Sequence, residues 1–405
     1  MNIVMLCDFY NESLEYQENL LVKYYRKHGH AVTVIASTFE SVFDYYNDKH
    51  EHKLPRRDYE DQGAHIIKLP YRFNFLNRLR AYPRIDALLD EARPDLIFVH
   101  DIMLNLPECV RYMKRHPNCR MILDYHADYS NSGKDTLSLK ILHGVIRKWF
   151  LDRARPHLSR IFPIVPASAT FLHEIYKIPH SEMEVLPLGA DTDLASEVRN
   201  EQAGNMLRRE LGIPDGHIVI FTGGKLAPAK KTELLIEAVA TLSDLPLQLV
   251  IVGAAGKENE AYGQELASLA EGCANIHFVG WLGRRDIYRY LDMANLAVFP
   301  ASQSILWQQA IAMGLPLIVG DTGHQDISYL NLYSNIVILK KENIQASQLR
   351  QAIEHVAGNP ARMREMRQGA IRVANEQLNW DKLIMRTLQF NDSTQVQPPA
   401  DLKVT

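Results

Sequence analysis

Short apolar runs alternate with amphipathic stretches along the whole chain. A parallel strand that is buried on both faces gives a continuous apolar run, and helices join such strands. The sequence therefore predicts an α/β chain made of parallel sheets. The predicted strands are Ile3–Leu6, Val32–Ala36, His65–Leu69, Leu96–Val99, Met121–Leu123, Ile161–Val165, Met183–Leu186, Ile218–Phe221, Leu247–Val252, Ile276–Val279, Leu296–Phe299, Leu317–Val319 and Ile336–Leu339.

The first amphipathic stretch shows the helical spacing clearly. Leu20, Leu21, Tyr24 and Tyr25 fall on one stripe of a helix, and Gly29 follows where a helix would end. A glycine is the common residue just past a helix C-terminus, because it adopts the left-handed conformation without strain. We expect a helix that packs on the first strand and ends at this glycine.

The length of 405 residues predicts two domains, since a single core stops growing near roughly 250 to 300 residues. The polar stretch 191–216 separates the two sets of strands. We expect Rossmann-like domains at 1–190 and 191–375, with their parallel sheets facing across a ligand-binding cleft. Residues 376–390 are predicted to form a terminal helix that packs back on the first domain. The segment 391–405 is predicted to be a disordered tail.

Composition excludes several classes of protein. With 21 Gly, 19 Pro and 4 Cys, the chain is neither collagen-like nor disulfide-rich. The cysteines are scattered, so we expect no zinc site and a reducing compartment. The formal net charge of -3 gives no reason to expect a nucleic-acid partner. Residues 1–8 lack the basic start of a signal peptide, and we expect a cytoplasmic protein.

A candidate anion-binding loop follows the strand Ile218–Phe221. Gly223 and Gly224 let the backbone approach a ligand, and Lys225 and Lys230 place two ammonium groups before a helix. The loop has neither the Walker A pattern nor a G-x-G-x-x-G pattern. Two interpretations stay open at this point, a diphosphate site and a solvated lysine-rich turn.

Several segments in fixed order resemble family 4 (GT4-type) retaining glycosyltransferases of the GT-B fold. The resemblance spans nearly the whole chain. The matching segments are Gly29–Val34, Pro94–His100, Leu186–Asp191, Gly224–Lys230 with the following Leu-Leu-Ile-Glu-Ala, Leu247–Gly253, Asn275–Trp281, Ala294–Pro300 and Ala310–Pro316.

The resemblance implies roles for individual residues. The basic pair on the donor diphosphate corresponds to Lys225, where arginine is usual, and to Lys230. The histidine that faces the donor sugar corresponds to His126. His126 has two alternative interpretations, a core histidine or one ligand of a metal site with Asp124 and Asp128. The resemblance implies transfer without a bound metal ion, so no metal or other cofactor is expected.

Two carboxylates of the family pattern are missing. Counting back from the Gly-Leu-Pro segment places Ala301 and Gln309 at these two positions. Gln309 keeps the capacity to hydrogen-bond a ribose, whereas Ala301 does not reach a donor sugar. Polar groups for the donor are then expected from Ser302, Gln303 and Ser304. The glycine-rich acceptor loop is also replaced, by Asn11–Glu18.

A basic stretch at 140–162 carries six Lys or Arg residues against Asp152 alone, interleaved with apolar residues. The pattern fits two structures equally well: a surface that binds anionic lipid, and a core-packed helix with a basic outer face. A second basic group is formed by Arg72, Arg78, Arg80 and Arg84. Asp191–Asp193 matches the D-x-D of metal-dependent transferases, but we interpret it as a turn.

The sequence thus predicts a retaining glycosyltransferase that moves a sugar from a nucleotide-diphosphate sugar to a glycan or lipid-linked acceptor in polysaccharide biosynthesis. We expect peripheral membrane contact through 140–162 on the inner face of the cell membrane. Two alternatives remain: a sugar-nucleotide-binding protein without turnover, suggested by Ala301 and Gln309, and a sugar-nucleotide epimerase, for which in-site carboxylates are not found.

Overall fold

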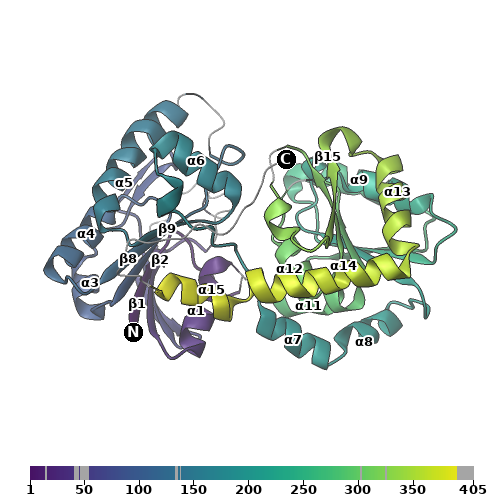
Figure 1. Cartoon of the computed structure of the whole chain (residues 1–405), viewed down its shortest axis with the longest axis horizontal. Coiled ribbons are helices and arrows are strands. Elements are labelled where there is room, and N and C mark those ends of the chain that lie inside the picture. Colours follow the sequence, from purple (N-terminus) through teal and green to yellow (C-terminus); the bar gives the residue numbers. More distant parts are fainter. Residues whose placement is uncertain are drawn as a thin grey trace. The chain divides into compact units, whose positions relative to one another are not determined.

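The structure is a computed structural model that describes residues 1–13, 16–40, 45, 54–132, 136, 138–301, 303–323 and 326–389 (Figure 1). The predicted tail 391–405 and Ser302 lie outside the described residues. The chain divides into two compact units, each with its own sheet. Unit 1 comprises Met1–Asn11, Leu21–Leu186 and the chain from Leu383 onward, and unit 2 comprises Glu12–Leu20 and Pro187–Lys382.

Unit 1 is built on a seven-stranded sheet in the order β3-β4-β2-β1-β7-β8-β9. All neighbouring strands are parallel except β3, which is antiparallel to β4. The strands are β1 (Asn2–Leu6), β2 (Ala31–Ser37), β3 (Arg57–Asp61), β4 (Ala64–Leu69), β7 (Leu96–His100), β8 (Arg120–Tyr125) and β9 (Arg160–Pro163), with a separate hairpin of β5 (Phe73–Phe75) and β6 (Leu79–Ala81).

Helices connect these strands and cover the sheet of unit 1 (Figure 1). They are α1 (Gln17–Lys27), α3 (Asp86–Ala92), α4 (Leu106–Arg115), the π-helical η1 (Ser138–Arg147), α5 (Lys148–Ala154), the 3-10 turn η2 (Arg155–His157), α6 (Pro166–Tyr176), the 3-10 turn η3 (His180–Glu182) and α15 (Trp380–Leu388). The first four residues of α1 and the first three of α15 belong by their contacts to unit 2.

Unit 2 is built on a six-stranded sheet in the order β12-β11-β10-β13-β14-β15, and all its strands are parallel. The strands are β10 (Ile218–Gly223), β11 (Leu247–Val252), β12 (Ile276–Gly280), β13 (Leu296–Phe299), β14 (Leu317–Asp321) and β15 (Ile336–Lys340). The helices are α7 (Thr192–Asn200), α8 (Ala203–Glu210), α9 (Thr232–Ala240), α10 (Glu260–Leu269), α11 (Arg284–Met293), α12 (Leu306–Ala312), α13 (Ala346–Ala357) and α14 (Pro360–Val373).

Short helical turns complete unit 2. They are η4 (Pro228–Lys230), η5 (Lys257–Asn259), η6 (Ser328–Leu330), η7 (Lys341–Asn343) and the π-helical η8 (Ala374–Leu378). The predicted terminal helix 376–390 is therefore in two parts: η8 continues α14, and α15 begins after Asn379. Within unit 2, the amide of Ala190 donates to the carbonyl of Leu378 at 3.1 Å. Within unit 1, Arg386 pairs with Glu184 at 2.6 Å.

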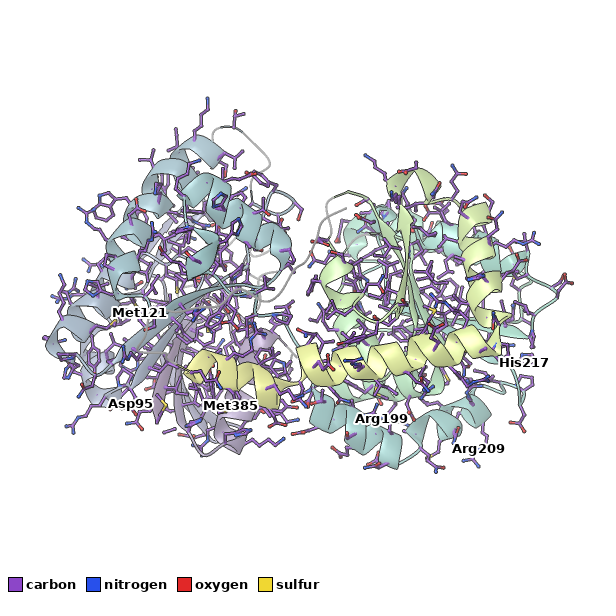
Figure 2. All side chains as sticks on the ribbon, in the orientation of Figure 1. Asp95, Met121, Arg199, Arg209, His217 and Met385 are labelled. Carbon is purple, nitrogen blue, oxygen red and sulfur yellow. The ribbon has the colours of Figure 1, made fainter. Side chains whose placement is uncertain are left out.

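Each sheet is covered by apolar side chains that fill the space up to its helices (Figure 2). The stripe predicted for the first helix is confirmed, because Leu20, Leu21, Tyr24 and Tyr25 are all buried in α1. Gly29 follows α1 with a φ of +79°, so the predicted helix end is also confirmed. Most of the stability of such a helix comes from packing its apolar stripe on the sheet, and less comes from the helix propensity of its residues.

Twelve of the thirteen predicted strands are present, and the strand predicted at 183–186 is wrong. This segment lies beside β9, where the amides of Glu184 and Leu186 donate to the carbonyls of Ile161 and Pro163. It forms only one isolated bridge, Ile161 to Met183. The next bridge would need a hydrogen bond from the amide of Pro163, and proline has no N–H to donate.

Candidate active site

Two glycines end the central strand of the unit 2 sheet. A Cβ on Gly223, the last residue of β10, would lie 2.7 Å from the carbonyl oxygen of Val252. Gly224 has a φ of +113°, which side chains of L-residues rarely allow. Both positions therefore require glycine, and the end of β10 is closely packed against Val252 and Leu306. This is the carboxyl edge of a parallel sheet, where ligands of such folds bind.

Lys230 connects two loops at this edge. Its ammonium group donates a hydrogen bond of 2.8 Å to the backbone carbonyl of Gln303, in the loop that follows β13. Burial lowers the pKa of Lys230, because the charged form is poorly solvated there. An ammonium group has three N–H donors, and Gln303 accepts from one of them. The structure thus brings the predicted residues Lys230 and Gln303 together.

Lys225 has a partner that the sequence did not suggest. Its ammonium group forms an ion pair with the carboxylate of Glu258, in the turn η5 that follows β11. The hydrogen bond from Lys225 holds the pKa of Glu258 below its usual range. Both side chains are exposed. The resemblance implies that the Lys225 ammonium group binds the donor diphosphate. In the structure this group instead pairs with a carboxylate from the loop of the neighbouring strand β11.

The helix after the loop is less open to an anion than expected. Lys231 precedes α9 in the left-handed conformation, with a φ of 52°. The amide of Thr232, at the first position of α9, donates to the hydroxyl of Tyr262 at 2.9 Å. That hydroxyl in turn donates to Glu233 at 2.5 Å. A phosphate at this edge would thus rely on the lysines and the glycine backbone rather than on the first amide of α9.

The loop after β13 carries the remaining predicted donor residues. Ser304 lies beside Gly224, since a Cβ on Gly224 would be 3.9 Å from the Ser304 hydroxyl. That hydroxyl accepts from the amide of Leu306 at 3.3 Å and so fixes the start of α12. Gln309 lies one turn further along α12 and is buried. Ala301, which replaces a family carboxylate, is also buried.

His126 follows directly after β8 in unit 1, beside two other polar residues at the carboxyl ends of neighbouring strands. Asp124 and His100 are opposite each other in the register of β8 and β7. One carboxylate oxygen of Asp124 lies 2.9 Å from Nδ1 of His100 and 3.2 Å from Nε2 of His126. The sequence analysis named His126 and Asp124 but missed His100. The signal available for His100 was its place at the end of an apolar strand, β7, next to the strand that carries Asp124.

The three side chains differ in exposure. Asp124 is fully buried and His100 nearly so, whereas the His126 side chain is 27% exposed. Burial by itself would raise the pKa of Asp124, but the neighbouring His100 and His126 lower it further than burial raises it, to well below its usual range. Asp124 therefore stays ionised and orients the accessible His126 ring.

The loop around His126 is held by local hydrogen bonds. The amide of His126 donates to Asp101 at 3.1 Å, and the side-chain amide of Asn131 donates to the His126 carbonyl at 3.0 Å. Asp128 accepts from the amides of Ser130 and Asn131 and so organises its own turn. The metal ligand set suggested as an alternative, with Asp128 as a member, is thus not assembled. Within the described chain, His100, Asp124 and His126 form the one cluster with ligand atoms within 4.8 Å of one another.

The D-x-D segment has a structural role, but it begins helix α7 and does not form the predicted turn. Asp191 is buried and caps α7 by accepting from the amide of Leu194 at 3.1 Å. Its carboxylate also pairs with Arg284, and its amide donates to the hydroxyl of Tyr288. These contacts occupy the Asp191 carboxylate, and they fix the start of α7 against α11.

The basic stretch 140–162 has both buried and exposed apolar side chains. Leu151 and Ala154 are buried against unit 1, as in a core-packed helix. Ile141, Val145 and Trp149, spaced four residues apart across η1 and α5, are each about half exposed or more. The guanidinium of Arg153 lies 3.5 Å from the centre of the Trp149 ring. Among the described helices, none is long and apolar enough to span a bilayer.

Comparison with known proteins assigns the chain to a family. A model for Glycosyltransferase Family 4 matches residues 19–194, and a model for Glycosyl transferases group 1 matches residues 205–373. The D-inositol 3-phosphate glycosyltransferase of Rhodococcus erythropolis is 25% identical over 223 residues, 53% of this chain and 49% of that protein. The putative glycosyltransferase YtcC of Bacillus subtilis is 26% identical over 295 residues, 67% of this chain and 64% of that protein.

The fold agrees with this assignment. The crystal structure of HepE from Anabaena in complex with UDP and glucose superposes with a TM-score of 0.64 at 17% identity, covering 96% of this chain and 99% of that one. The predicted GT-B fold is therefore confirmed, and the chain belongs to the family 4 type of glycosyltransferases. The chain spans about half the length of the D-inositol 3-phosphate glycosyltransferases it matches first.

Proposed function

We propose that the protein is a retaining glycosyltransferase that moves a sugar from a nucleotide diphosphate sugar to a glycan or lipid-linked acceptor in polysaccharide biosynthesis. The observation that carries this proposal is the position of Lys230. Its ammonium group joins the loop that follows the two glycines at the end of β10 to Gln303 in the loop that follows β13. HepE, the Anabaena protein of similar fold, was crystallised with UDP and glucose, which supports a nucleotide-sugar donor. The family assignment supports sugar transfer as the reaction.

The proposed chemistry depends on charge at the leaving group. The bond between the anomeric carbon and the diphosphate oxygen breaks, and a bond from that carbon to the acceptor oxygen forms. The acceptor proton passes to the departing diphosphate, so no strong base on the protein is needed. Lys230 and Lys225 stabilise the negative charge that develops on the diphosphate. The Lys225 ammonium exchanges Glu258 for a phosphate oxygen as the donor binds.

We propose that this transfer needs no metal ion and that His126 orients the donor sugar. One carboxylate oxygen of Asp124 lies within hydrogen-bonding distance of both His100 and His126, and this contact orients the two rings. A chelator such as EDTA should leave the transfer rate unchanged. His126→Ala should lower kcat by about 100-fold, with little effect on UDP binding. Loss of activity in EDTA that Mn²⁺ restores would assign the cluster to a metal instead.

We propose that the acceptor binds polar residues at the carboxyl ends of β1 and β7 in unit 1. A hollow there has a volume of about 30 Å³, room for about one water molecule, so it marks only the polar surface on which an acceptor would lie. It is lined by Asp8, Arg78, Arg80, Asp101 and Arg147, among others. Asp8 accepts from the hydroxyl of Tyr71 at 2.6 Å and pairs with Arg80. Asp101 also binds the amide of His126. Carboxylates and guanidinium groups of this kind hydrogen-bond sugar hydroxyls.

Peripheral membrane contact through 140–162 suits a lipid-linked acceptor. The exposed side chains of Ile141, Val145 and Trp149 form an apolar stripe, and Lys140, Lys148 and Arg153 lie on the same two helices. Such a surface binds anionic lipid in two ways: the apolar side chains enter the membrane interface, and the basic side chains attract the negative headgroups. Sedimentation with phosphatidylglycerol vesicles should be lost in Val145→Glu. Met206→Glu is the matched control, since Met206 is a similarly exposed apolar residue of unit 2.

The test of the donor is a thermal-shift panel of UDP-, GDP-, ADP- and CMP-sugars. A ligand that binds only the folded chain raises the unfolding midpoint by mass action. The second candidate function, binding without turnover, is favoured by the buried Ala301 and Gln309 in place of carboxylates. Product formation from the bound donor separates transfer from binding, and appearance of the donor's epimer would identify the epimerase.

A further inference from the structure

The hairpin of β5 and β6 in unit 1 has one polar and one apolar face. Cross-strand pairing places Asn74 opposite Arg80 on the polar face. The side chain of Asn74 accepts from the hydroxyl of Tyr45 at 2.7 Å, and Arg80 pairs with Asp8. The polar face of the hairpin is therefore directed toward the rest of unit 1.

The apolar face is directed the other way, because successive residues of a strand point to opposite faces. Phe73 and Phe75 form this face with their cross-strand partners Ala81 and Leu79. The two phenylalanine rings lie nearly parallel with their centres 6.4 Å apart, and each side chain is about half exposed. A surface hairpin usually buries its apolar face and leaves its polar face in water. The opposite arrangement here indicates an apolar partner outside the chain.

The turn of the hairpin adds a third exposed apolar side chain. Leu76 and Asn77 form its centre, and the amide of Arg78 closes the turn by donating to the carbonyl of Phe75 at 3.1 Å. Both central residues have a positive φ, 51° for Leu76 and 54° for Asn77. Such turns favour asparagine or glycine, and leucine is uncommon in this conformation. Leu76 is nevertheless 76% exposed, so neither its backbone nor burial in the chain explains a large apolar residue here.

The hairpin and its flanks are basic. Residues 71–84 include four arginines and no acidic residue. Two of these arginines have carboxylate partners, since Arg80 pairs with Asp8 and Arg84 with Asp86. The other two, Arg72 and Arg78, are exposed and pair with no carboxylate among the residues that the structure describes. The exposed apolar side chains are thus flanked by positive charge.

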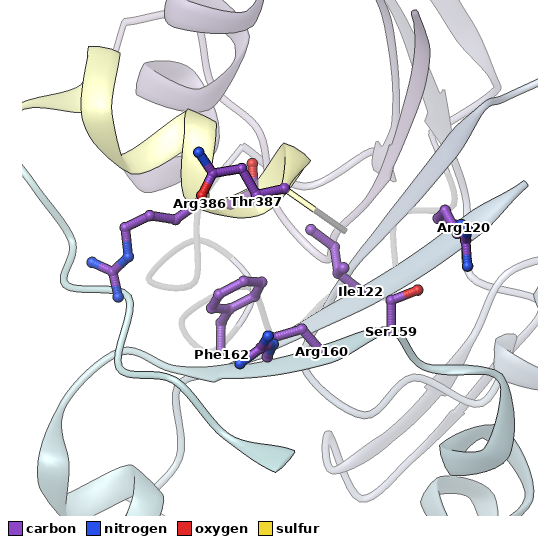
Figure 3. A pocket seen from close by; sticks show the side chains of 8 residues that line it. Arg120, Ile122, Ser159, Arg160, Phe162, Arg386 and Thr387 are labelled. Carbon is purple, nitrogen blue, oxygen red and sulfur yellow. The ribbon is translucent and has the colours of Figure 1, made fainter. Parts of the chain in front are cut away.

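A group of arginines at the other edge of the unit 1 sheet differs in this respect. Figure 3 shows Arg160 on β9 and Arg386 on α15, at the edge where β8 and β9 begin. Both contact the same carboxylate, because Glu184 lies 2.6 Å from Arg386 and 3.5 Å from Arg160. Clustered arginines in unit 1 are therefore not always directed at a partner outside the chain, and the hairpin is distinguished by its lack of such pairs at Arg72 and Arg78.

The hairpin touches the stretch 140–162. The guanidinium group of Arg147, the last residue of η1, donates to the backbone carbonyl of Arg78 at 3.1 Å. Arg78 and Arg147 also line the hollow that marks the polar surface proposed for the acceptor. A headgroup bound on this surface would thus lie next to both basic segments.

We propose that the tip of this hairpin, formed by Phe73, Phe75 and Leu76, inserts into the interface of an anionic membrane. Apolar side chains enter the boundary between headgroups and acyl chains, and neighbouring arginines attract negative headgroups. A second copy of the chain is a poorer partner, because symmetric pairing of two hairpins would bring their arginines together. The proposal adds a second segment to the membrane contact of the proposed function, and it rests on that function only for the lipid-linked acceptor.

The test is sedimentation of the full chain with vesicles that contain phosphatidylglycerol. Leu76→Asn removes the apolar side chain and suits a positive φ, so it should weaken vesicle binding by roughly tenfold or more without lowering thermal stability. Leu332→Asn is the matched control, since Leu332 is an exposed leucine of unit 2. It should bind vesicles as the wild type does.

The charge is tested in the same assay at low salt. Arg72→Gln should weaken binding to phosphatidylglycerol vesicles by roughly fivefold, and it should have no effect on binding to vesicles of phosphatidylcholine alone. Arg160→Gln removes the same charge from the other edge of the sheet and should leave vesicle binding unchanged.

Four results would overturn the proposal. They are a wild-type chain that does not bind phosphatidylglycerol vesicles, equal binding by wild type and Leu76→Asn, an equal loss in Leu332→Asn, and a dimer in light scattering that dissociates in Leu76→Asn. Normal binding by Leu76→Asn together with a loss in Val145→Glu would leave only the contact through 140–162. Because Leu76 lies outside the donor loop, Leu76→Asn should keep the wild-type UDP affinity, which separates failure of this proposal from failure of the donor assignment.

Discussion

The ammonium group of Lys230 lies 2.8 Å from the backbone carbonyl of Gln303, so one side chain joins the loops that follow β10 and β13. These strands are neighbours in the sheet of unit 2. Their loops therefore meet at the carboxyl edge, where Gly224 and Ser304 are also close. The donor assignment rests on this juxtaposition of a partly desolvated cation and a strand end that requires glycine.

The charge of Lys230 should control donor affinity. Burial lowers its pKa from 10.5, and a bound phosphate favours the charged form. UDP affinity should therefore fall as the pH rises through this lowered pKa, below the value of an exposed lysine. Lys230→Arg, which stays protonated, should bind UDP with a flat profile between about pH 7 and about pH 10 in calorimetry. A profile shared by both proteins would show that another group is responsible.

The ion pair between Lys225 and Glu258 should compete with the donor. Lys225→Ala should weaken UDP binding by roughly tenfold, because a charge-assisted contact to phosphate is lost. Glu258→Gln frees the ammonium group and should tighten UDP binding severalfold at low salt. Glu260→Gln, a nearby exposed carboxylate in α10, is the control and should have no effect. Equal UDP affinities in all four proteins would remove Lys225 from the donor site.

Gln309 should contact the nucleoside part of the donor. If it hydrogen-bonds the ribose, Gln309→Ala should weaken UDP and UDP-sugar binding by the same factor. Gln308→Ala is the matched control, since Gln308 is equally buried in α12 but donates to the hydroxyl of Tyr329. The control should lower thermal stability with little change in UDP affinity. A loss confined to the sugar-bearing ligand would move Gln309 away from the ribose.

Asp124 should stabilise unit 1 in a pH-dependent way. Its pKa is lowered from 3.8 in the folded chain, so its contribution is present above 3.8 and is lost as the pH falls through the lower folded-state value. Asp124→Asn should reduce the free energy of unfolding by about 3 to 5 kcal/mol at neutral pH, and the difference should shrink in acid. The measurement is urea denaturation across pH.

The control for this variant is Asp90→Asn, an exposed carboxylate paired with Arg115. Such a surface pair is worth about 0 to 1 kcal/mol. An Asp124→Asn variant as stable as the wild type would contradict the charge assignment within the histidine cluster.

The buried strands were predictable from sequence because parallel strands covered on both faces leave uninterrupted apolar runs. The strands β3, β5 and β6 were missed, since their residues are mostly exposed or only partly buried and follow no apolar run. The segment 183–186 has the composition of a strand, but Pro163 of its neighbour cannot complete the ladder. The apolar pattern of a segment thus indicates that the segment is buried. It does not indicate whether the neighbouring strand can supply the backbone hydrogen bonds of a sheet.

The site was predictable where its residues are close in sequence. The glycines and lysines of the donor loop lie within eight residues of one another, from Gly223 to Lys230. Partners from other loops were not predictable, because no local pattern links Lys225 to Glu258 or His126 to His100. These pairs arise from the order of strands in each sheet, which the sequence alone does not state.

The most direct test of the account is transfer from the best donor of the thermal-shift panel, followed by proton NMR of the anomeric signal in donor and product. The acceptor source is a lipid extract of bacterial membranes. The account predicts a product whose anomeric configuration equals that of the donor, formed by the wild type and lost in Lys230→Ala. A product of inverted configuration, or tight donor binding without transfer or hydrolysis, would contradict it.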